Sequence, residues 1–505
     1  MFSIDIFLSQ MWPKIAIFTF MATIEVICSQ SAQENAELVR TAPAKIVCYG
    51  DKIVVDVINE MLAKSTTIHW HGIFQKGTQY QDGVPMISQC PVLGSTTHRY
   101  SFYANQPGTF YWHSHDGTQK IDGLQGSLII RRPKENEPHA AHYDLDDPSH
   151  VIFIADWYHS DSLQHFPGLT NPPDPALDAT YFLINGRGRY KDEKTGNMSN
   201  APYTKFVVKK GFKYRFRLIG ATCTHCFTRF SIEGHRLKII ATDANTINPV
   251  EVDYLDIYTG ERFDFVLNAS QEIKQYRILV VGMGQPCRDS GIYQSAILHY
   301  EGASQEDSLT DLSVSPDINF KGVALNPVNS TCSGSGICVA QLEALENFNQ
   351  TVLRPEPNVT YTMEFGYYYP STEEEFERNT FMRYTHPEPT SPNVIFWINN
   401  ISAITPASPL LSQREDIPSS IYCKNGSNNV PECKTDLCHC LHILRVPLGS
   451  LAQFILIDKC YWLFHCHFVK HHVAGMSLVV QVGEPEDLPP VPKGFPKCGN
   501  YLPVD

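Results

Sequence analysis

The stretch Trp462-Leu463-Phe464-His465-Cys466-His467 gives the clearest indication of how this 505-residue chain folds, because two histidines flank a cysteine in an apolar run typical of a β-strand. Side chains of a strand alternate between its two faces, so the two histidines face one way and Cys466 faces the other. His471 and Met476 follow Cys466 by five and ten residues. A cysteine, a histidine and a distant methionine are three of the four ligands of a blue-copper site. The stretch therefore predicts a strand that connects two metal sites.

Two further segments carry the same His-x-His pattern, Thr67-Ile68-His69-Trp70-His71-Gly72 and Phe110-Tyr111-Trp112-His113-Ser114-His115. Neutral imidazole is the most common metal ligand, and each pair presents two imidazoles to one side of a strand. One such pair alone is more often a surface feature than a site. Three pairs, each in a segment that contains a tryptophan, favour a metal centre. The alternative, a buried free cysteine beside packed histidines, leaves the spacing of His471 and Met476 unexplained.

The rest of the chain also has the pattern of β-structure. Short apolar or alternating stretches recur between glycine, proline, asparagine and aspartate, and no amphipathic helix pattern of comparable length interrupts them. The 34 prolines and 31 glycines suit many turns. We therefore predict an all-β protein of sandwiches or barrels. The clearest predicted strands are 52–58, 127–131, 151–156, 214–219, 262–267 and 476–482.

Two polar stretches divide the chain. The first, 132–148, is rich in histidine and aspartate, and the second runs from 301 to about 357 with many serine, asparagine and proline residues. We interpret both as linkers between domains. This predicts β domains at 38–135, 146–300 and 355–485, the last shortened near 458–460, followed by a tail at 486–505.

The composition indicates a secreted glycoprotein. Lys14 precedes an apolar run, 15–27, and small and polar residues follow, so we expect a signal peptide at 1–30. Fifteen cysteines favour disulfide formation in an oxidising compartment. No run is long enough for a comfortable membrane span, and a net charge of −13 without a basic run argues against nucleic acid as a partner. Seven N-x-S/T acceptor sequences support secretion: Asn197, Asn268, Asn329, Asn349, Asn358, Asn400 and Asn425.

The three histidine segments, in this order, resemble the first, second and fourth copper-binding segments of the multicopper oxidases, with animal laccases the most similar. Stretches at 79–85, 183–186, 241–243 and 260–262 resemble the first two domains of that family, and the tail at 488–498 resembles insect laccases in particular. The resemblance implies three cupredoxin-like Greek-key β-barrel domains, the third incomplete.

The resemblance also implies a role for individual residues. Asp82 is similar to the acid that helps supply protons near the trinuclear copper cluster, although an aspartate before a glycine is also a common turn residue. Cys90 and Cys498 are similar to a pair that ties the first domain to the third. The implied copper ligands are His69 for type 2 copper, His71, His113, His115, His465 and His467 for the type 3 pair, and Cys466 and His471 for type 1 copper with Met476 as the axial ligand.

The third segment of the family, His-Pro-x-His-Leu-His-Gly, has no counterpart in this chain. Lys459 and Cys460 alone connect the predicted strand at 451–458 to the His-Cys-His stretch. Relative to the family, each type of copper site therefore loses one histidine. We expect fewer copper ions than the four that the family binds, and a weakly held type 1 site.

The resemblance implies a laccase-type reaction, in which phenols or diphenols lose single electrons at type 1 copper and O₂ is reduced to water at the trinuclear cluster. A small phenolic substrate and O₂ are the expected partners. Two alternatives stay open. One is a catalytically inactive secreted glycoprotein with partial copper binding, as a splice variant or an incomplete gene model would give. The other is a ferroxidase or an ascorbate-oxidase-like enzyme.

Overall fold

A computed structural model describes most of the chain, and regular structure within it consists almost entirely of β-strands and short 3-10 helices. The predicted all-β class is therefore confirmed. None of the helices within these residues is long and apolar enough to cross a membrane. The described residues are 2–8, 18–24, 45–61, 63–158, 162, 181–191, 195–223, 227–284, 287, 291–304, 320–328, 332–346, 356–368, 395–423, 437–457, 475–482, 486 and 490–498.

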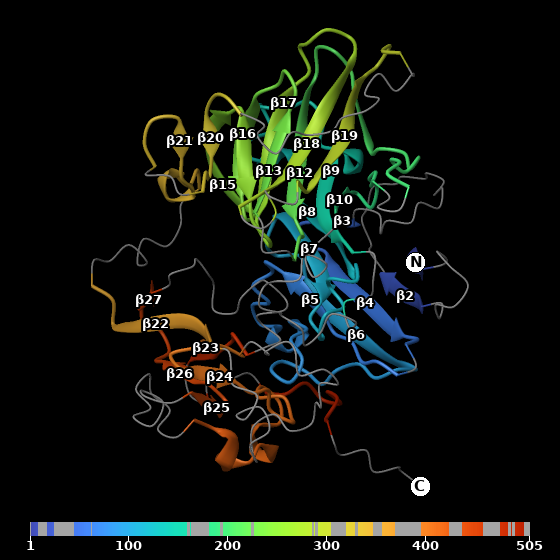
Figure 1. The fold of residues 1–505 in the computed structure, drawn as a ribbon. Coiled ribbons are helices and arrows are strands. Elements are labelled where there is room, and N and C mark those ends of the chain that lie inside the picture. The colour runs from blue at the N-terminus through green and yellow to red at the C-terminus, as the bar shows by residue number, and fades with distance from the viewer. Residues whose placement is uncertain are drawn as a thin grey trace.

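The strands form three units that follow one another along the chain (Figure 1). The first unit, drawn in blue to teal, contains two four-stranded sheets. Their order is β3-β8-β7-β5 and β1-β2-β4-β6. The strands are β1 (Phe2–Leu8), β2 (Phe18–Ile24), β3 (Lys45–Cys48), β4 (Lys52–Asn59), β5 (Ile68–His71), β6 (Thr96–Tyr103), β7 (Gly108–Ser114) and β8 (Gln125–Arg131).

The core of the first unit forms because one face of each strand is apolar. Ile53, Val55 and Val57 alternate along β4 and are buried, and they join Trp70 and Trp112 in one hydrophobic cluster. Burial of such side chains stabilises the folded state by about 25 cal/mol for each Å² removed from water. The strands β1 and β2 lie in the stretch interpreted as a leader, and that interpretation stays a prediction.

The second unit, green to yellow in Figure 1, is the largest. Its six-stranded sheet has the order β10-β9-β12-β17-β14-β15, and its seven-stranded sheet has the order β11-β19-β18-β13-β16-β20-β21. Large apolar side chains such as Phe216, Phe230 and Phe265 fill its core. The strands are β9 (Val151–Trp157), β10 (Tyr181–Ile184), β11 (Lys205–Val208), β12 (Lys213–Gly220), β13 (Phe227–Ile232), β14 (Leu237–Thr242), β15 (Asn245–Val252), β16 (Tyr254–Ile257), β17 (Arg262–Asn268), β18 (Gln275–Met283), β19 (Tyr293–Tyr300), β20 (Ala324–Leu325) and β21 (Gly336–Ile337).

The third unit, orange to red, has a five-stranded sheet in the order β25-β24-β23-β22-β27 and a β26-β28 pair. Its hydrophobic cluster is small and includes Met363, Phe365, Phe396 and the predicted copper ligand Met476. The strands are β22 (Val359–Tyr368), β23 (Ile395–Ile398), β24 (Ile401–Ala403), β25 (Cys438–Cys440), β26 (Ile443–Val446), β27 (Ala452–Ile457) and β28 (Val479–Val482).

Five of the six predicted strands match β4, β8, β9, β12 and β17 to within two residues at each end. The sixth, 476–482, begins only at Val479. Gly475 explains the difference, because its φ of +109° makes a turn, and its carbonyl accepts hydrogen bonds from the amides of Ala403 and Ser477. In the second predicted linker, 320–346 carries β20 and β21, which extend a sheet of the second unit.

The first and third units are joined covalently by the Cys90–Cys498 disulfide, as the family resemblance implied. The Gln413 amide lies beside this bond and exchanges two hydrogen bonds with the backbone of Cys498, of 2.6 and 3.1 Å. The backbone amides of Leu410 and Leu411 also donate hydrogen bonds to the first unit, to the carbonyl oxygens of Met86 and Ile87. Two further disulfides close loops at Cys332–Cys338 and Cys423–Cys440.

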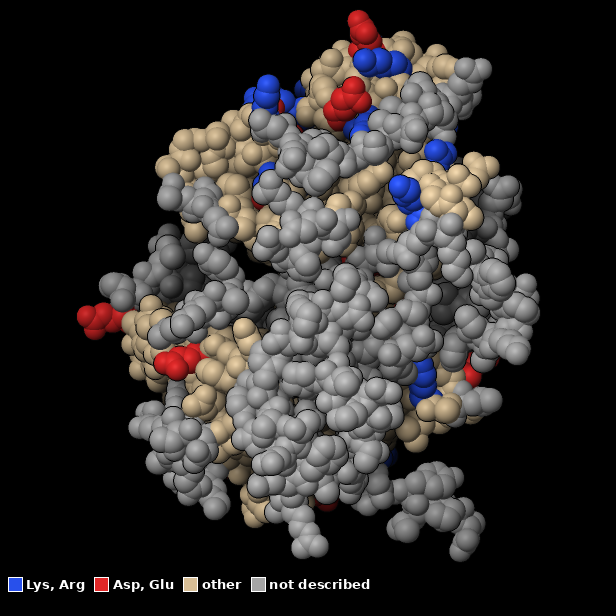
Figure 2. All heavy atoms as spheres, viewed as in Figure 1, with Lys and Arg blue, Asp and Glu red and all other residues tan. Residues whose placement is uncertain are grey.

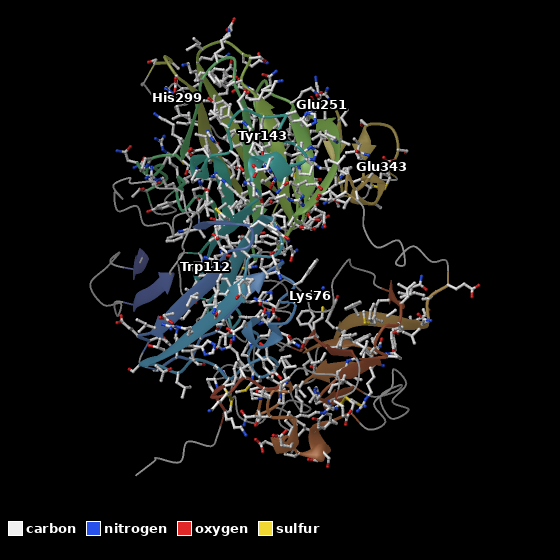
Figure 3. All side chains as sticks on the ribbon, turned by 180° about the vertical axis from the view of Figure 1, so that it is seen from behind. Lys76, Trp112, Tyr143, Glu251, His299 and Glu343 are labelled. Carbon is white, nitrogen blue, oxygen red and sulfur yellow. A yellow bond between two sulfur atoms is a disulfide. The ribbon has the colours of Figure 1, made fainter. Side chains whose placement is uncertain are left out.

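Buried charges join the first unit to the second. Asp264 on β17 is 2% exposed and accepts hydrogen bonds from Arg215 (2.6 Å) and Arg217 (3.0 Å) on the neighbouring strand β12. The hydroxyl of Thr109, on β7 of the first unit, donates to the same carboxylate at 2.5 Å. Asp146 from the first predicted linker binds Arg217 at 2.6 Å. This linker therefore packs against the second unit. Tyr143, another residue of the linker, is labelled there in Figure 3.

Charged side chains on the face shown in Figure 2 lie singly or in small groups of mixed sign. Arg236 and Glu251 of the second unit form an exposed ion pair at 3.1 Å. The described part of that face presents no continuous basic patch.

Candidate metal centre

The candidate centre is built on two adjacent antiparallel strands of the first unit. In the β5–β7 pair, His69 lies opposite His113 and Trp70 lies opposite Trp112. Because side chains alternate along a strand, both tryptophans enter the core while the histidines occupy the other face. The alternation predicted from the His-x-His pattern is therefore what places these imidazoles together.

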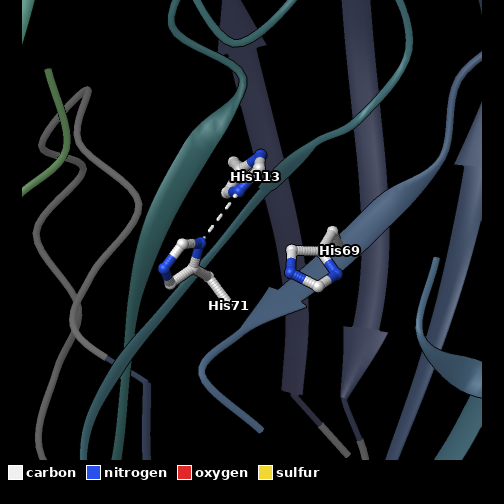
Figure 4. A group of neighbouring side chains, drawn as sticks. All are labelled: His69, His71 and His113. Atoms are coloured by element: carbon white, nitrogen blue, oxygen red, sulfur yellow. Dashed lines mark hydrogen bonds between the residues drawn. The ribbon is translucent and has the colours of Figure 1, made fainter. Parts of the chain in front are cut away.

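Three imidazoles converge in this region (Figure 4). His69, His71 and His113 offer ring nitrogens that all lie within 4.8 Å of one another. Nδ1 of His71 and Nε2 of His113 are 3.4 Å apart and share a hydrogen bond. The ring of His115 is adjacent, with its centroid 5.4 Å from that of His69. A set of imidazole donors at this spacing fits a transition-metal ion such as copper.

Hydrogen bonds to the outer ring nitrogens orient two of the imidazoles. Nδ1 of His69 lies 2.8 Å from the carbonyl oxygen of Asp82 and 3.3 Å from its carboxylate. Nδ1 of His113 lies 2.8 Å from the carbonyl oxygen of Ser114. In both rings these contacts occupy Nδ1, so Nε2 is the nitrogen that would bind a metal, in His113 in place of its hydrogen bond with His71. A metal-bound histidine usually donates its other N–H to a carbonyl or carboxylate.

Asp82 also affects the pKa of His69. Burial of the His69 ring lowers its pKa, but the carboxylate and carbonyl of Asp82 act in the opposite direction, and the pKa is raised overall. The position of Asp82 depends on the next residue, Gly83. There φ is +79°, and an added Cβ would lie 1.8 Å from the carbonyl oxygen of Ile68. Only glycine lets this turn approach β5 so closely.

The histidines pack against buried side chains that in turn contact the second unit. The Tyr111 ring stacks on His71, with centroids 4.4 Å apart, and the ammonium of Lys120 lies 5.6 Å from the Tyr111 ring centre. Lys120 is 3% exposed and donates to the carbonyl oxygen of Thr222 in the second unit. Burial lowers the pKa of Lys120, but Cys223, Tyr111 and Asp156 raise it overall.

The predicted site residues divide into three groups. His69, His71, His113, His115 and Asp82 lie together in the first unit. Met476 lies in the third unit and is 4% exposed. The remaining predicted ligands lie outside the described residues; they are His465, Cys466, His467 and His471.

Comparison with known proteins identifies the family. Family models described as multicopper oxidase match residues 39–135 and 148–303. Laccase-1 of Fomitopsis schrenkii is 30% identical over 509 residues, which cover 90% of this chain and 83% of the relative. The chain belongs to the multicopper oxidase family. Multicopper oxidases bind copper, and the imidazoles of the first unit suit that metal.

Other relatives match a shorter part of this multicopper oxidase. A laccase of Trametes maxima is 39% identical over 311 residues, and the match covers 59% of each chain. A laccase of Phlebia radiata is 38% identical, and the match covers 56% of its length. The chain thus spans little more than half of the length of these relatives.

Solved structures of multicopper oxidases share the fold. The laccase from Botrytis aclada has a TM-score of 0.61 at 19% identity, with 88% of this chain and 83% of that chain covered. Fet3p, a multicopper oxidase that functions in iron import, has a TM-score of 0.63 at 15% identity, with 96% and 90% covered. At these identities the likeness concerns the fold, and it confirms the cupredoxin-like architecture expected for a multicopper oxidase.

Sequence patterns missed three groups that surround the histidines. Arg262 donates from Nε to the carbonyl oxygen of Thr109 at 3.0 Å, and a Cβ on Gly72 would lie 2.5 Å from its guanidinium. Lys120 and Gln119 approach the site from the segment after His115. The Gly-Glu-Arg motif at 260–262 marked Arg262 as similar to the family, but no local pattern indicates what these side chains touch.

Proposed function

We propose that the chain binds copper through the histidines of its first unit. The observation that carries this proposal is the convergence of His69, His71 and His113, with ring nitrogens within 4.8 Å of one another. The hydrogen bonds that His69 and His113 donate to the carbonyl oxygens of Asp82 and Ser114 support it, because they fix the orientation of two rings before a metal binds. His115 and, by sequence, His465 and His467 complete the proposed set for the trinuclear cluster.

We further propose a laccase-type function, the oxidation of phenols or diphenols with reduction of O₂ to water. When bound, copper supplies the one-electron chemistry of such a reaction. The residues of this chain would hold and orient the metal, and we assign to Asp82, 3.3 Å from Nδ1 of His69, the proton-supplying role that the family resemblance implies. The similarity to laccases from three fungi supports this reaction. Cys466 and His471, with Met476 as axial ligand, are the proposed type 1 residues.

The reaction is tested by restoring the missing segment. We expect the copper-loaded chain as it stands to show no intense blue thiolate-to-copper absorption and negligible diphenol oxidation, because type 1 copper lacks one histidine. Insertion of a relative's whole missing block, which contains the His-Pro-x-His-Leu-His-Gly segment, between Asp458 and Cys460 should produce both. Visible absorption and oxygen uptake with a diphenol measure the outcome.

The control is the same insertion with Cys466→Ser, which should abolish the blue absorption again. An inserted protein that binds copper and shows neither property would contradict the laccase proposal. Strong blue absorption and turnover in the unmodified chain would instead show that another residue, such as His442 or His472, completes the type 1 site.

We also propose that the protein is secreted and N-glycosylated. Asn197, Asn268 and Asn358 are exposed, so these acceptor residues are accessible for modification. Expression in insect or mammalian cells should yield a product whose electrophoretic mobility increases after glycosidase treatment. A control with these three residues changed to glutamine should show a smaller shift. An unglycosylated product confined to the cytosol would show that the leader interpretation is wrong.

A further inference from the structure

His115 differs from the other histidines of the first unit because it lies beyond the end of its strand. The strand β7 ends at Ser114, and the β5–β7 pairing stops with Ile68 opposite Ser114. One backbone hydrogen bond, from the amide of His115 to the carbonyl oxygen of Thr67, continues the pairing at 3.2 Å. Correct placement of His115 therefore needs support from outside the strand ladder.

The side-chain amide of Gln119 supplies contacts at this point. Its Oε1 accepts hydrogen bonds from the hydroxyls of Thr66 and Ser114, both at 2.8 Å. Its Nε2 donates to the carbonyl oxygen of Ser65 at 2.6 Å. Thr66 and Ser114 are buried, so their hydroxyls depend on protein partners rather than bulk water.

These three bonds connect the two histidine segments directly. Ser65 and Thr66 shortly precede His69, and Ser114 lies between His113 and His115. The hydroxyl of Ser114 also accepts the amide of Asp116 at 3.2 Å, which closes the turn after His115. The Gln119 amide thus helps to fix the distance between the segment before β5 and the segment after β7, together with the hydrogen bond from the Ser65 hydroxyl to the Asp116 carboxylate at 2.6 Å.

We propose that Gln119 is a positioning residue for the metal centre, which it serves by fixing His113 and His115 relative to His69. The inference rests on the proposed copper binding. An amide suits the role because it accepts two hydroxyl protons and donates to a carbonyl at the same time. A carboxylate keeps the two acceptor contacts and loses the donor, and a thioether loses all three.

The test compares Gln119→Met and Gln119→Glu with the unmodified full-length chain. We expect the dissociation constant for Cu²⁺ to rise about 10- to 100-fold in Gln119→Met, the range for loss of a partner that orients a ligand. The Gln119→Glu variant should fall between that variant and the unmodified protein. The electron paramagnetic resonance spectrum of bound Cu²⁺ should change in Gln119→Met, since ligand placement changes.

Gln294→Met is the matched control. Gln294 is a buried glutamine of the second unit whose Nε2 donates to the carbonyl oxygens of Phe182 and Arg189, at 2.8 and 3.2 Å. Its replacement removes a comparable amide contact far along the chain from the histidines. Copper affinity and the copper spectrum should stay unchanged in this variant, even where thermal stability falls.

A second measurement needs no copper. Hydrogen exchange in the metal-free protein, followed by mass spectrometry, should show faster exchange of the amides at 113–116 in Gln119→Met than in Gln294→Met. Unchanged exchange there, or copper affinity equal to that of the unmodified protein, would overturn the proposal. Failure of the unmodified protein to bind copper would instead refute the proposed function, while the exchange result would still decide whether Gln119 positions His115.

Discussion

Replacement of Asp264 by alanine should lower the free energy of unfolding by about 3–5 kcal/mol, the usual effect of removing one partner from a buried ion pair. The Asp264 side chain is 2% exposed and lies between Arg215 and Arg217, which are 4% and 3% exposed. Without the carboxylate, two guanidinium groups stay buried and lose a shared partner. The hydroxyl of Thr109 also loses its acceptor.

Chemical denaturation of Asp264→Ala and of the unmodified protein, followed by tryptophan fluorescence, measures this effect. Glu251→Ala is the control, because Glu251 forms an ion pair with Arg236 in which both side chains are about half exposed. Exposed pairs contribute about 0–1 kcal/mol. An effect of Asp264→Ala no larger than that of Glu251→Ala would show that the buried network does not stabilise the fold.

Replacement of His113 by alanine should remove most of the bound copper. Its Nε2 lies 3.4 Å from Nδ1 of His71, so the variant loses a donor from the centre of the cluster. The same loss is expected for His71→Ala. Cys466→Ser should change the copper content little, because the type 1 site that we propose for Cys466 lacks one histidine. Metal analysis after dialysis against copper-free buffer gives the number of ions that each protein retains.

His142→Ala is the control for a histidine outside the centre, since Nδ1 of His142 contacts Lys238 of the second unit at 2.9 Å. Its copper content should equal that of the unmodified protein. Equal copper losses in Cys466→Ser and His113→Ala would mean that the type 1 site is intact. Equal losses in His142→Ala and His113→Ala would mean that the bound copper is not held by the first-unit cluster.

Part of the candidate site was predictable because it depends on local geometry. The two-residue spacing of His69 and His71 decides which face of β5 they share, and in the structure their ring nitrogens lie close to one of His113. The spacing cannot indicate which distant side chains support the ligands. Gln119 reaches Ser65, 54 residues earlier, and Thr109 reaches Asp264, 155 residues later. Such contacts follow from the packing of strands and not from any short pattern.

In the fold, too, local patterns predicted some features and missed others. Alternation and apolar runs predicted β4, β8, β9, β12 and β17, because each buries a face in a core. The start of β28 was misplaced, since the apolar residues Met476 and Leu478 pack on the third-unit core from a segment outside the strand. The apolar side chains of Met476 and Leu478 indicate that this segment is buried, but they do not indicate a strand. Its backbone conformation follows from the turn at Gly475.

The hydrogen bond between Thr109 and Asp264 affects how the chain can be divided into fragments and how it folds during synthesis. During synthesis the segment with His113 leaves the ribosome well before β17, so the Thr109 hydroxyl has no carboxylate partner until the second unit has been made. The first unit, which we propose binds copper, therefore has buried groups whose partners lie in the second unit. A fragment cut near residue 135, intended as a small copper carrier, would expose the Thr109 side of β7 and free Lys120 from Thr222. A minimal engineered version therefore has to retain the chain through β17 or redesign that surface with residues that need no partner.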